Sequence, residues 1–215
     1  MDTREHSSAA EFLPQKRSIE SLRAAARSCR GCDLYTNATQ TVFGEGPRSA
    51  AVMFVGEQPG DMEDRKGHPF VGPAGRLFDK ALVEARIPRD DVYITNAVKH
   101  FRWIQRGKRR LHQKPLIRQV VACKPWLEAE IQAVHPKVVV CLGATAAQSM
   151  AGRTVRIMQE RGTFLYGDSG AAIFITIHPS SIYRLQEKDE QEKEYRRFVA
   201  EMKSVQRKLR SIAAA

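Results

Sequence analysis

The chain has 215 residues and a formal net charge of +11, with a sequence pI of about 9.8. This length suits one α/β domain with a full hydrophobic core, and the positive charge favours a polyanionic partner: DNA, RNA or an anionic membrane surface. No apolar run approaches the roughly 20 residues of a membrane span, and the N-terminus lacks the apolar segment of a secretory signal, which argues against a membrane-spanning or secreted protein and predicts a cytoplasmic one.

The chain begins with a polar segment and a short helix. We expect residues 1–15 to form a flexible N-terminus ahead of a single domain over residues 16–215. A serine that is a typical N-cap begins a predicted helix over residues 18–26. The helix leads into Cys29 and Cys32, a CxxC pair whose two thiolates can converge on one metal.

The stretch over residues 56–75 is the first candidate site. It follows a short apolar run, residues 51–55, that predicts a buried strand, and it precedes an amphipathic helix over residues 74–86. A loop of this length inside a βα unit is uncommon unless it is functional, and open α/β sheets bind ligands beyond the carboxyl ends of their strands. The loop lacks the Walker A and GxGxxG patterns. Its candidate site residues are Gly56, Glu57, Gln58, Asp61 and Phe70.

A second strand and a basic segment follow. The strand covers residues 92–97 and carries Asn96, whose amide offers a donor and an acceptor side by side, which suits reading the edge of a base. Residues 99–118 contain eight lysines and arginines and no acid, which predicts a loop that contacts phosphates. His112, in the sequence KRRLH, is a candidate nucleophile or acid–base group there.

The other two cysteines lie further along the chain. Cys123 falls on a predicted helix over residues 115–134, and Cys141 falls on a third buried strand over residues 137–142. Four cysteines in a cytosolic chain suggest a metal or cluster site more than two disulfides. Zinc ribbons usually pair two CxxC knuckles and this chain has one, whereas a [4Fe–4S] cluster tolerates uneven spacing. The spacing favours a cluster slightly, and zinc or unligated buried thiols stay open.

The last strands flank the sequence GDSG. Residues 163–166 and 172–177 predict a hairpin or a pair of strands. The second run ends in HPSS, so His178 is placed at the same sheet edge as Glu57 and Asn96. Polar groups that converge on one edge of the sheet predict a site at that edge. A long charged helix completes the chain.

Three motifs together with the cysteines resemble the iron–sulfur branch of the uracil-DNA glycosylase superfamily, and its UdgX-type members in particular. The motifs are GEQPG at residues 56–60, KRRLH at residues 108–112 and HPSS at residues 178–181. KRRLH separates UdgX-type proteins from the other iron–sulfur members, although their loop commonly has isoleucine where this chain has Leu111. The resemblance implies an α/β/α sandwich around a four-stranded parallel sheet. It also implies a structural [4Fe–4S] cluster held by Cys29, Cys32, Cys123 and Cys141.

The resemblance further implies a role for each site residue. In UdgX-type proteins the histidine of the KRRxH loop takes the place of water and bonds to C1′ of the sugar, and that role maps onto His112. Glu57 would orient or activate that imidazole, and His178 would donate to uracil O2 as charge develops on the departing base. Uracil would be bound by Gly56, Gln58, Asp61, Phe70 and Asn96, and DNA by Lys108, Arg109, Arg110, Ser180, Ser181 and Arg184.

These residues predict a protein that excises uracil from single- or double-stranded DNA and becomes covalently attached to the abasic site, once per molecule. Phe70 supplies a face for uracil to stack on, and Asn96 can pair with the O4 and N3–H edge, which cytosine presents in the opposite sense. A conventional iron–sulfur glycosylase with many turnovers is the alternative, and a DNA-binding module without activity is a third hypothesis. We expect a monomer.

Overall fold

The computed structural model describes residues 8–166 and 170–214 and is built around a five-stranded sheet. The sheet order is β2-β1-β5-β7-β6. Four neighbouring strands are parallel, and the edge strand β6 pairs antiparallel with β7. The predicted four-stranded parallel sheet is therefore confirmed, with one edge strand added. The strands are β1 (Val52–Gly56), β2 (Val92–Asn96), β5 (Val138–Leu142), β6 (Phe164–Tyr166) and β7 (Ala172–Thr176).

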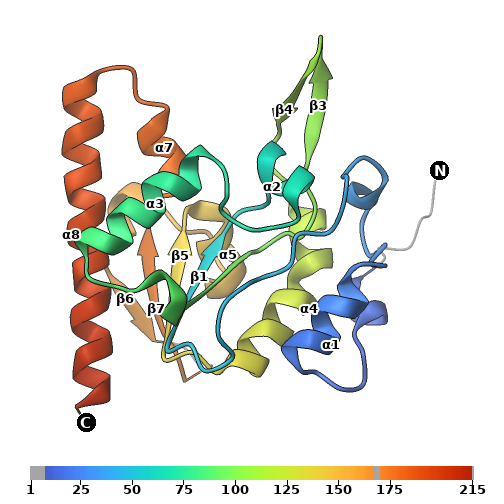
Figure 1. Ribbon diagram of the computed structural model, residues 1–215, viewed down its shortest axis with the longest axis horizontal. Coiled ribbons are helices and arrows are strands. Elements are labelled where there is room, and N and C mark those ends of the chain that lie inside the picture. Colours follow the sequence, from blue (N-terminus) through green and yellow to red (C-terminus); the bar gives the residue numbers. More distant parts are fainter. Residues whose placement is uncertain (1–7, 167–169, 215) are drawn as a thin grey trace.

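Helices cover both faces of the sheet and make a three-layer sandwich (Figure 1). Every residue of the four parallel strands is buried, as expected for a sheet packed on both sides. One face is covered by α3 (Pro73–Glu84), α7 (Pro179–Tyr183) and α8 (Lys188–Ala213). The other is covered by α1 (Ile19–Ala26), α4 (Ile117–Val134) and α5 (Ala144–Ala151).

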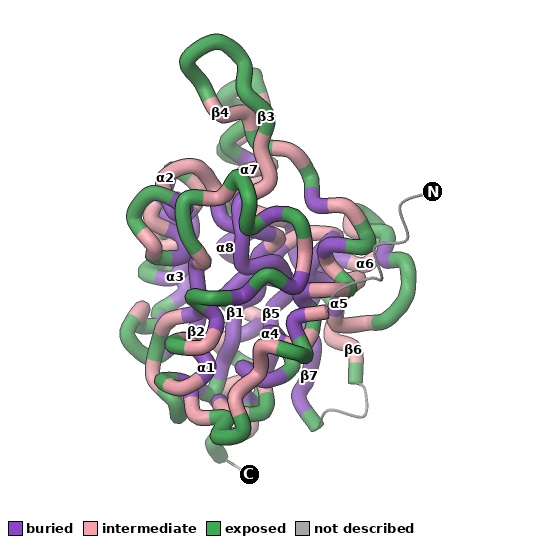
Figure 2. The backbone as a smooth tube through the Cα atoms, turned by 90° about the vertical axis from the view of Figure 1, so that its right-hand side faces the viewer, coloured by how far each residue is buried: buried purple, intermediate pink, exposed green. Residues whose placement is uncertain are grey.

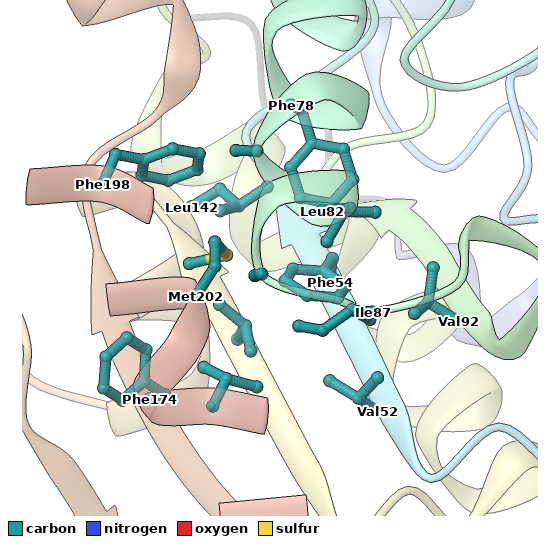
Figure 3. Close-up of a cluster of buried hydrophobic side chains, with 14 of the residues drawn as sticks. Val52, Phe54, Phe78, Leu82, Ile87, Val92, Leu142, Phe174, Phe198 and Met202 are labelled. Carbon is teal, nitrogen blue, oxygen red and sulfur yellow. The ribbon is translucent and has the colours of Figure 1, made fainter. Parts of the chain in front are cut away.

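Successive side chains of β1 point to opposite faces of the sheet, and the core is accordingly divided into two halves. Phe54 packs with Phe78 of α3 and Phe198 of α8 (Figure 3), whereas Met53 faces the opposite half with Leu127 of α4. Full burial of one such side chain contributes roughly 1.5–3 kcal/mol. The last helix packs through one face, since Tyr195, Phe198, Val199, Met202 and Val205 all belong to the first half.

Three segments differ from the expectation. The loop after β1 contains a short helix, α2 (Asp61–Lys66), and the basic segment forms a hairpin of β3 (Trp103–Arg106) and β4 (Arg109–His112). The segment expected to be flexible contains a 3-10 helix, Ala9–Phe12, because buried Ala9 and half-buried Phe12 pack into the core beside α4. Residues 1–7, and Gly167, Asp168 and Ser169 of the expected GDSG turn, lie outside the described residues. The remaining short helices are Asp33–Thr36, Arg89–Asp91 and α6 (Ile157–Glu160).

The hairpin projects from the body of the protein, and its tip is exposed (Figures 1 and 2). In its register His112 pairs with Trp103, at the end nearest the sheet. Gly107 adopts a positive φ of 57° at the tip, where a Cβ atom added to it would meet nothing within 4 Å. The geometry therefore places His112 beside the body and leaves Arg106, Lys108 and Arg109 exposed toward the tip.

The outer edge of β2 is also paired. Glu45 and Ile94 exchange two backbone hydrogen bonds, of 2.9 and 2.7 Å, so the loop before β1 continues the ladder for one residue pair. In the part of the chain that the structure describes, no helix combines the length and apolarity needed to cross a membrane.

Candidate active site

A cavity of about 850 Å³ opens at the carboxyl ends of the parallel strands. Its lining includes Glu57 after β1, Asn96 at the end of β2 and His178 after β7. His112 reaches the same cavity from the base of the hairpin. The convergence of Glu57, Asn96 and His178, predicted from their positions after the parallel strands, is confirmed.

Asn96 and Phe70 meet above Gly56. The strand register pairs Gly56 with Asn96, and a Cβ atom added at residue 56 would lie 2.3 Å from Asn96 Oδ1 and 2.8 Å from the Phe70 ring. No side chain fits at that approach, so glycine is required for the amide and the aromatic ring to share one wall. This wall offers a flat apolar surface and an amide edge to the same ligand.

Phe70 is held in a strained backbone conformation, with φ of 58°. Left-handed backbone is uncommon for a bulky residue and persists where the surroundings enforce it. The Phe70 ring packs on Phe78 with centroids 5.4 Å apart and lies 5.9 Å from the His178 ring. The strain is therefore located at the residue that faces the cavity.

Glu57 is oriented by a residue that the sequence did not single out. Thr145, in the first turn of α5, donates from Oγ1 to Glu57 Oε2 over 2.6 Å. The other carboxylate oxygen, Oε1, lies 3.5 Å from Nε2 of His112. Partial burial lowers the pKa of His112. The nearby Glu57 carboxylate acts in the opposite direction and raises this pKa, whereas the charge of Arg184 lowers it further. The imidazole is thus biased toward its neutral form beside a fixed carboxylate.

His178 is a neutral hydrogen-bond donor. The Ser180 backbone N–H donates to Nδ1 over 3.1 Å, so the proton of the neutral ring lies on Nε2. Burial, with the charges of Arg184 and His112, lowers the pKa of His178 to about 4. The Ser180 hydroxyl lies 2.8 Å from the same Nδ1, and Ser181 donates to the His178 carbonyl over 2.7 Å. Both serines therefore hold His178.

Gln58 and Arg110 tie the hairpin to the body. The Gln58 amide donates to the carbonyls of Arg102 and Gln113 over 3.2 and 3.0 Å and accepts from the Arg102 N–H over 3.1 Å. These bonds use its polar atoms, so Gln58, expected to bind uracil, holds the hairpin and lines the cavity.

The Arg110 guanidinium bonds to two acids of α2. It reaches Asp61 over 2.5 Å and fully buried Asp64 over 2.7 Å, and it lies over the rings of Phe101 and Trp103. Arg110 was expected to contact DNA. In the structure its guanidinium is instead paired with Asp61 and Asp64, so Arg110 holds the hairpin to the body. Asp61 likewise binds Arg110 and Arg65 while lining the cavity. Lys108 and Arg109 are exposed near the hairpin tip, and exposed Arg184 lines the cavity.

A buried ion pair supports the strand that carries Asn96. Lys99 Nζ donates to the Asn96 carbonyl over 2.7 Å and to Glu130 Oε2 over 2.5 Å, and both charged side chains are almost fully buried. Glu130 also accepts from the Gly44 N–H and from the hydroxyls of Tyr93 and Thr95. The network joins α4, β2 and the loop before β1 directly beneath the cavity wall.

Three of the four cysteines lie together. Cys29 and Cys123 belong to one buried cluster, against which Cys32 packs. Burial raises the pKa of Cys123 to about 12, with contributions from Cys32 and Cys29. Trp126 Nε1–H donates to Cys29 Sγ over 3.2 Å, and the Lys99 N–H donates to Cys123 Sγ over 3.3 Å. N–H groups that donate to the ligating sulfurs in this way are typical of iron–sulfur centres.

Cys141 lies apart from these three. It is fully buried in a different cluster of the core, with Met53, Val55 and Ala146, and burial alone raises the pKa of its thiol. No group of three or more His, Cys, Asp or Glu is arranged to hold a single metal ion within residues 8–166 and 170–214. An iron–sulfur cluster is held by ligands on several iron atoms, so the three neighbouring thiols are compatible with such a cluster. The four-cysteine ligand set expected from the sequence is not, because Cys141 lies apart from the other three.

A buried histidine lies beside the three thiols. His100 directly follows Lys99, whose N–H binds Cys123, and its Nε2 lies 2.9 Å from Thr41 Oγ1. That hydroxyl donates to the Ala26 carbonyl, which also accepts the Cys29 N–H. Burial lowers the pKa of His100 to about 4, so the imidazole is neutral. In the sequence, the only sign of a role for His100 was its position shortly after a strand. Only the three-dimensional structure shows that it lies near the thiols.

Comparisons with known proteins agree with the fold. A family model described as the uracil DNA glycosylase superfamily matches residues 43–203. The chain is 37% identical over 167 residues to the Type-4 uracil-DNA glycosylase of Thermotoga maritima, covering 77% of this chain and 83% of that protein. For the proteins of the same name from Archaeoglobus fulgidus and Sulfurisphaera tokodaii, identity is 40% over 131 residues (61% and 62% covered) and 34% over 172 residues (76% and 75% covered). The chain belongs to the uracil-DNA glycosylase superfamily.

Proposed function

We propose that this protein excises uracil from DNA and then forms a covalent bond between His112 and C1′ of the resulting abasic sugar. The family and the relatives named Type-4 uracil-DNA glycosylases support the excision. The approach of His112 to Glu57, at 3.5 Å inside the same cavity as Asn96 and Phe70, supports the covalent step.

The base-binding step uses the wall over Gly56. A glycosylase takes the nucleotide out of the stack and holds its base in a pocket. Uracil would stack on Phe70 and pair its O4 and N3–H with the Asn96 amide, whereas cytosine would leave buried polar groups unpaired. The Nε2–H of neutral His178 would donate to O2 of the departing base and stabilise its negative charge.

The bond-making step balances as a substitution at C1′. The C1′–N1 bond breaks and its electron pair leaves with uracil, which makes the sugar oxocarbenium-like. A ring nitrogen of neutral His112 then donates its lone pair to C1′, and the positive charge that appears on the ring is shared with Glu57. A tethered imidazole has a large effective-concentration advantage over water. Because release of the imidazole from C1′ would need a further hydrolysis step, we expect each molecule to act once.

The cysteines and His100 would hold a [4Fe–4S] cluster, whose contribution is to cross-link three segments of the chain and not to act at C1′. We propose Cys29, Cys32, Cys123 and His100 as the ligands in place of the set that includes Cys141. The burial of Cys29, Cys123 and His100, the packing of Cys32 against the cluster that holds the two buried thiols, and the N–H···S bonds to Cys29 and Cys123 support the assignment.

The test is a denaturing gel of the protein mixed with uracil-containing oligonucleotide. We expect a band that resists heat and detergent, formed with uracil DNA and absent with thymine DNA. His112→Ser should abolish the band, and because the smaller side chain admits water, the variant should still release uracil. His68→Ser, which changes an exposed histidine outside the cavity, is the matched control and should keep the band. Uracil release without any band in the wild type would instead indicate a conventional glycosylase with many turnovers.

A further inference from the structure

The cavity extends beyond the residues that the proposed reaction uses. Its volume of about 850 Å³ lies near the top of the roughly 300–1,000 Å³ range that accommodates drug-sized ligands, which is far more than one pyrimidine needs. Uracil recognition and attack on C1′ involve one end, around Phe70 and His112. The other end is lined by Ile157 and Met158 of α6, by Tyr183 and Leu185 at the end of α7, and by Glu194 of α8.

Helix α7 connects the two ends. His178 caps its N-terminus, and Tyr183 is its last residue, five positions further on. At 1.5 Å per residue this separation is about 7.5 Å along the helix axis, more than twice the 3.4 Å step between stacked nucleotides of one strand. If the uracil of a DNA strand lies against His178, the next nucleotide of that DNA strand can therefore reach Tyr183 only when it is unstacked from its neighbours. In Figure 1, α7 and the hairpin stand at the same end of the molecule, on either side of the strand ends.

The chemistry of the far end suits a base and not a phosphate. Tyr183 and Met158 are 62% and 67% exposed, although both are large apolar side chains at the rim of a cavity. An aromatic ring accepts the face of any base, and a thioether adapts to it. The Glu194 carboxylate, paired with Arg161 over 2.5 Å, offers oxygen acceptors and no cation to a phosphate. Exposed Arg184, one residue after Tyr183, supplies the cation that a phosphate between the two nucleotides needs.

We propose that this far end of the cavity, the neighbour lobe (Met158, Tyr183 and Leu185), binds the base adjacent to the uracil in the same strand. The proposal rests on the proposed function, since it extends the substrate from one flipped uracil to a dinucleotide. Binding the neighbour requires it to leave the stack, so the lobe favours single-stranded or distorted DNA over a regular duplex.

The experiment pairs a change in the protein with a change in the substrate. Single-stranded oligonucleotides carry one uracil, with either a normal nucleotide or a base-free tetrahydrofuran nucleotide immediately 5′ or 3′ to it. The second-order rate constant for uracil release is measured for the wild type, Tyr183→Ala, Tyr183→Phe and Tyr166→Ala. Tyr166 is 72% exposed and lies outside the cavity, so its variant controls for loss of a surface tyrosine.

We expect removal of the neighbouring base on one side to slow the wild type and Tyr166→Ala by about 5- to 150-fold, the range that base–aromatic stacking supports. On the normal substrate, the rate constant of Tyr183→Ala should be lower than that of the wild type by a similar factor. Removing the neighbouring base from the substrate should lower the rate constant of this variant little further. Tyr183→Phe, which keeps the ring, should behave like the wild type. A merely structural effect of Tyr183 would slow both substrates equally and leave the base dependence intact.

Two results would overturn the proposal. One is a wild type that is indifferent to the base-free nucleotide on both sides, which would indicate that the lobe holds something other than a neighbouring base, such as a small molecule or a protein side chain. The other is an unchanged base dependence in Tyr183→Ala. Absence of uracil release from the normal substrate by the wild type would instead contradict the proposed function itself.

Discussion

Replacing Lys99 with methionine should destabilise the protein strongly, because it leaves Glu130 as an unpaired buried charge. Both side chains are almost fully buried, and the Lys99 Nζ lies 2.5 Å from the Glu130 carboxylate. Removing one partner of such a pair costs about 3–5 kcal/mol. For a chain of this size each kcal/mol shifts the melting temperature by roughly 2–4 °C, so Lys99→Met should lower it by about 6–20 °C.

The double variant separates the charge from the packing. Glu130→Gln keeps an amide oxygen for the Gly44 N–H and the Tyr93 hydroxyl but removes the negative charge. Lys99→Met combined with Glu130→Gln should therefore be more stable than Lys99→Met alone, because no unpaired charge is left in the core. Lys203→Met, at an exposed lysine of α8, is the control for loss of a positive charge and should change the melting temperature little.

The assay is thermal unfolding followed by circular dichroism, on samples matched for iron content. The reasoning is refuted if Lys99→Met melts within about 2 °C of the wild type, which corresponds to less than roughly 1 kcal/mol. It is also refuted if the effects of the two substitutions simply add, because independent sites give additive changes and coupled ones do not.

Four further predictions concern the site and the cluster. Iron content per chain should fall in His100→Ala and stay at the wild-type level in Cys141→Ala; the reverse result would restore the four-cysteine set. Asn96→Ala should lose on the order of 1–3 kcal/mol or more of transition-state binding for uracil release while keeping its affinity for uracil-free DNA, and an unchanged rate would mean that another group reads the base. In titrations with single-stranded DNA, Lys108→Ala should reduce the slope of log K against log salt by about 0.7, and an unchanged slope would exclude this contact. Because His178 has a pKa lowered to about 4, its neutral form is lost only as pH falls through about 4, so uracil release by His112→Ser should be flat from pH 7 to 5; a decline centred near the ordinary value of about 6.5 would contradict the buried neutral donor.

The sheet and the position of the cavity could be predicted from the sequence because both follow from local patterns. Apolar runs identified the parallel strands. Because parallel strands present their carboxyl ends at one edge of the sheet, the sequence alone predicted that Glu57, Asn96 and His178 lie close together. The hairpin carrying His112 was expected as a loop, because its strands of four residues are mostly exposed and show no period-2 pattern.

The partners of the side chains could not be predicted. The guanidinium of Arg110 looks like any other cation of the basic segment, and only the placement of α2 shows that Asp61 and buried Asp64 engage it. The cysteines present the same limit. Spacing along the chain does not say that Cys141 is buried with Met53 and Val55, in a different cluster of the core from Cys29, because the packing of α1 and α4 on the sheet decides which side chains meet.

The paired outer edge of β2 bears on how the protein behaves at high concentration. A free strand edge is a template on which a second chain can add, and it is a common starting point for aggregation. Here Glu45 occupies part of the β2 edge through two backbone bonds, and the opposite edge ends in β6, which is only three residues long. Among the described residues neither side of the sheet presents a long bare ladder. A protein proposed to stay attached to DNA after one reaction can therefore gather at neighbouring lesions without its sheets joining edge to edge.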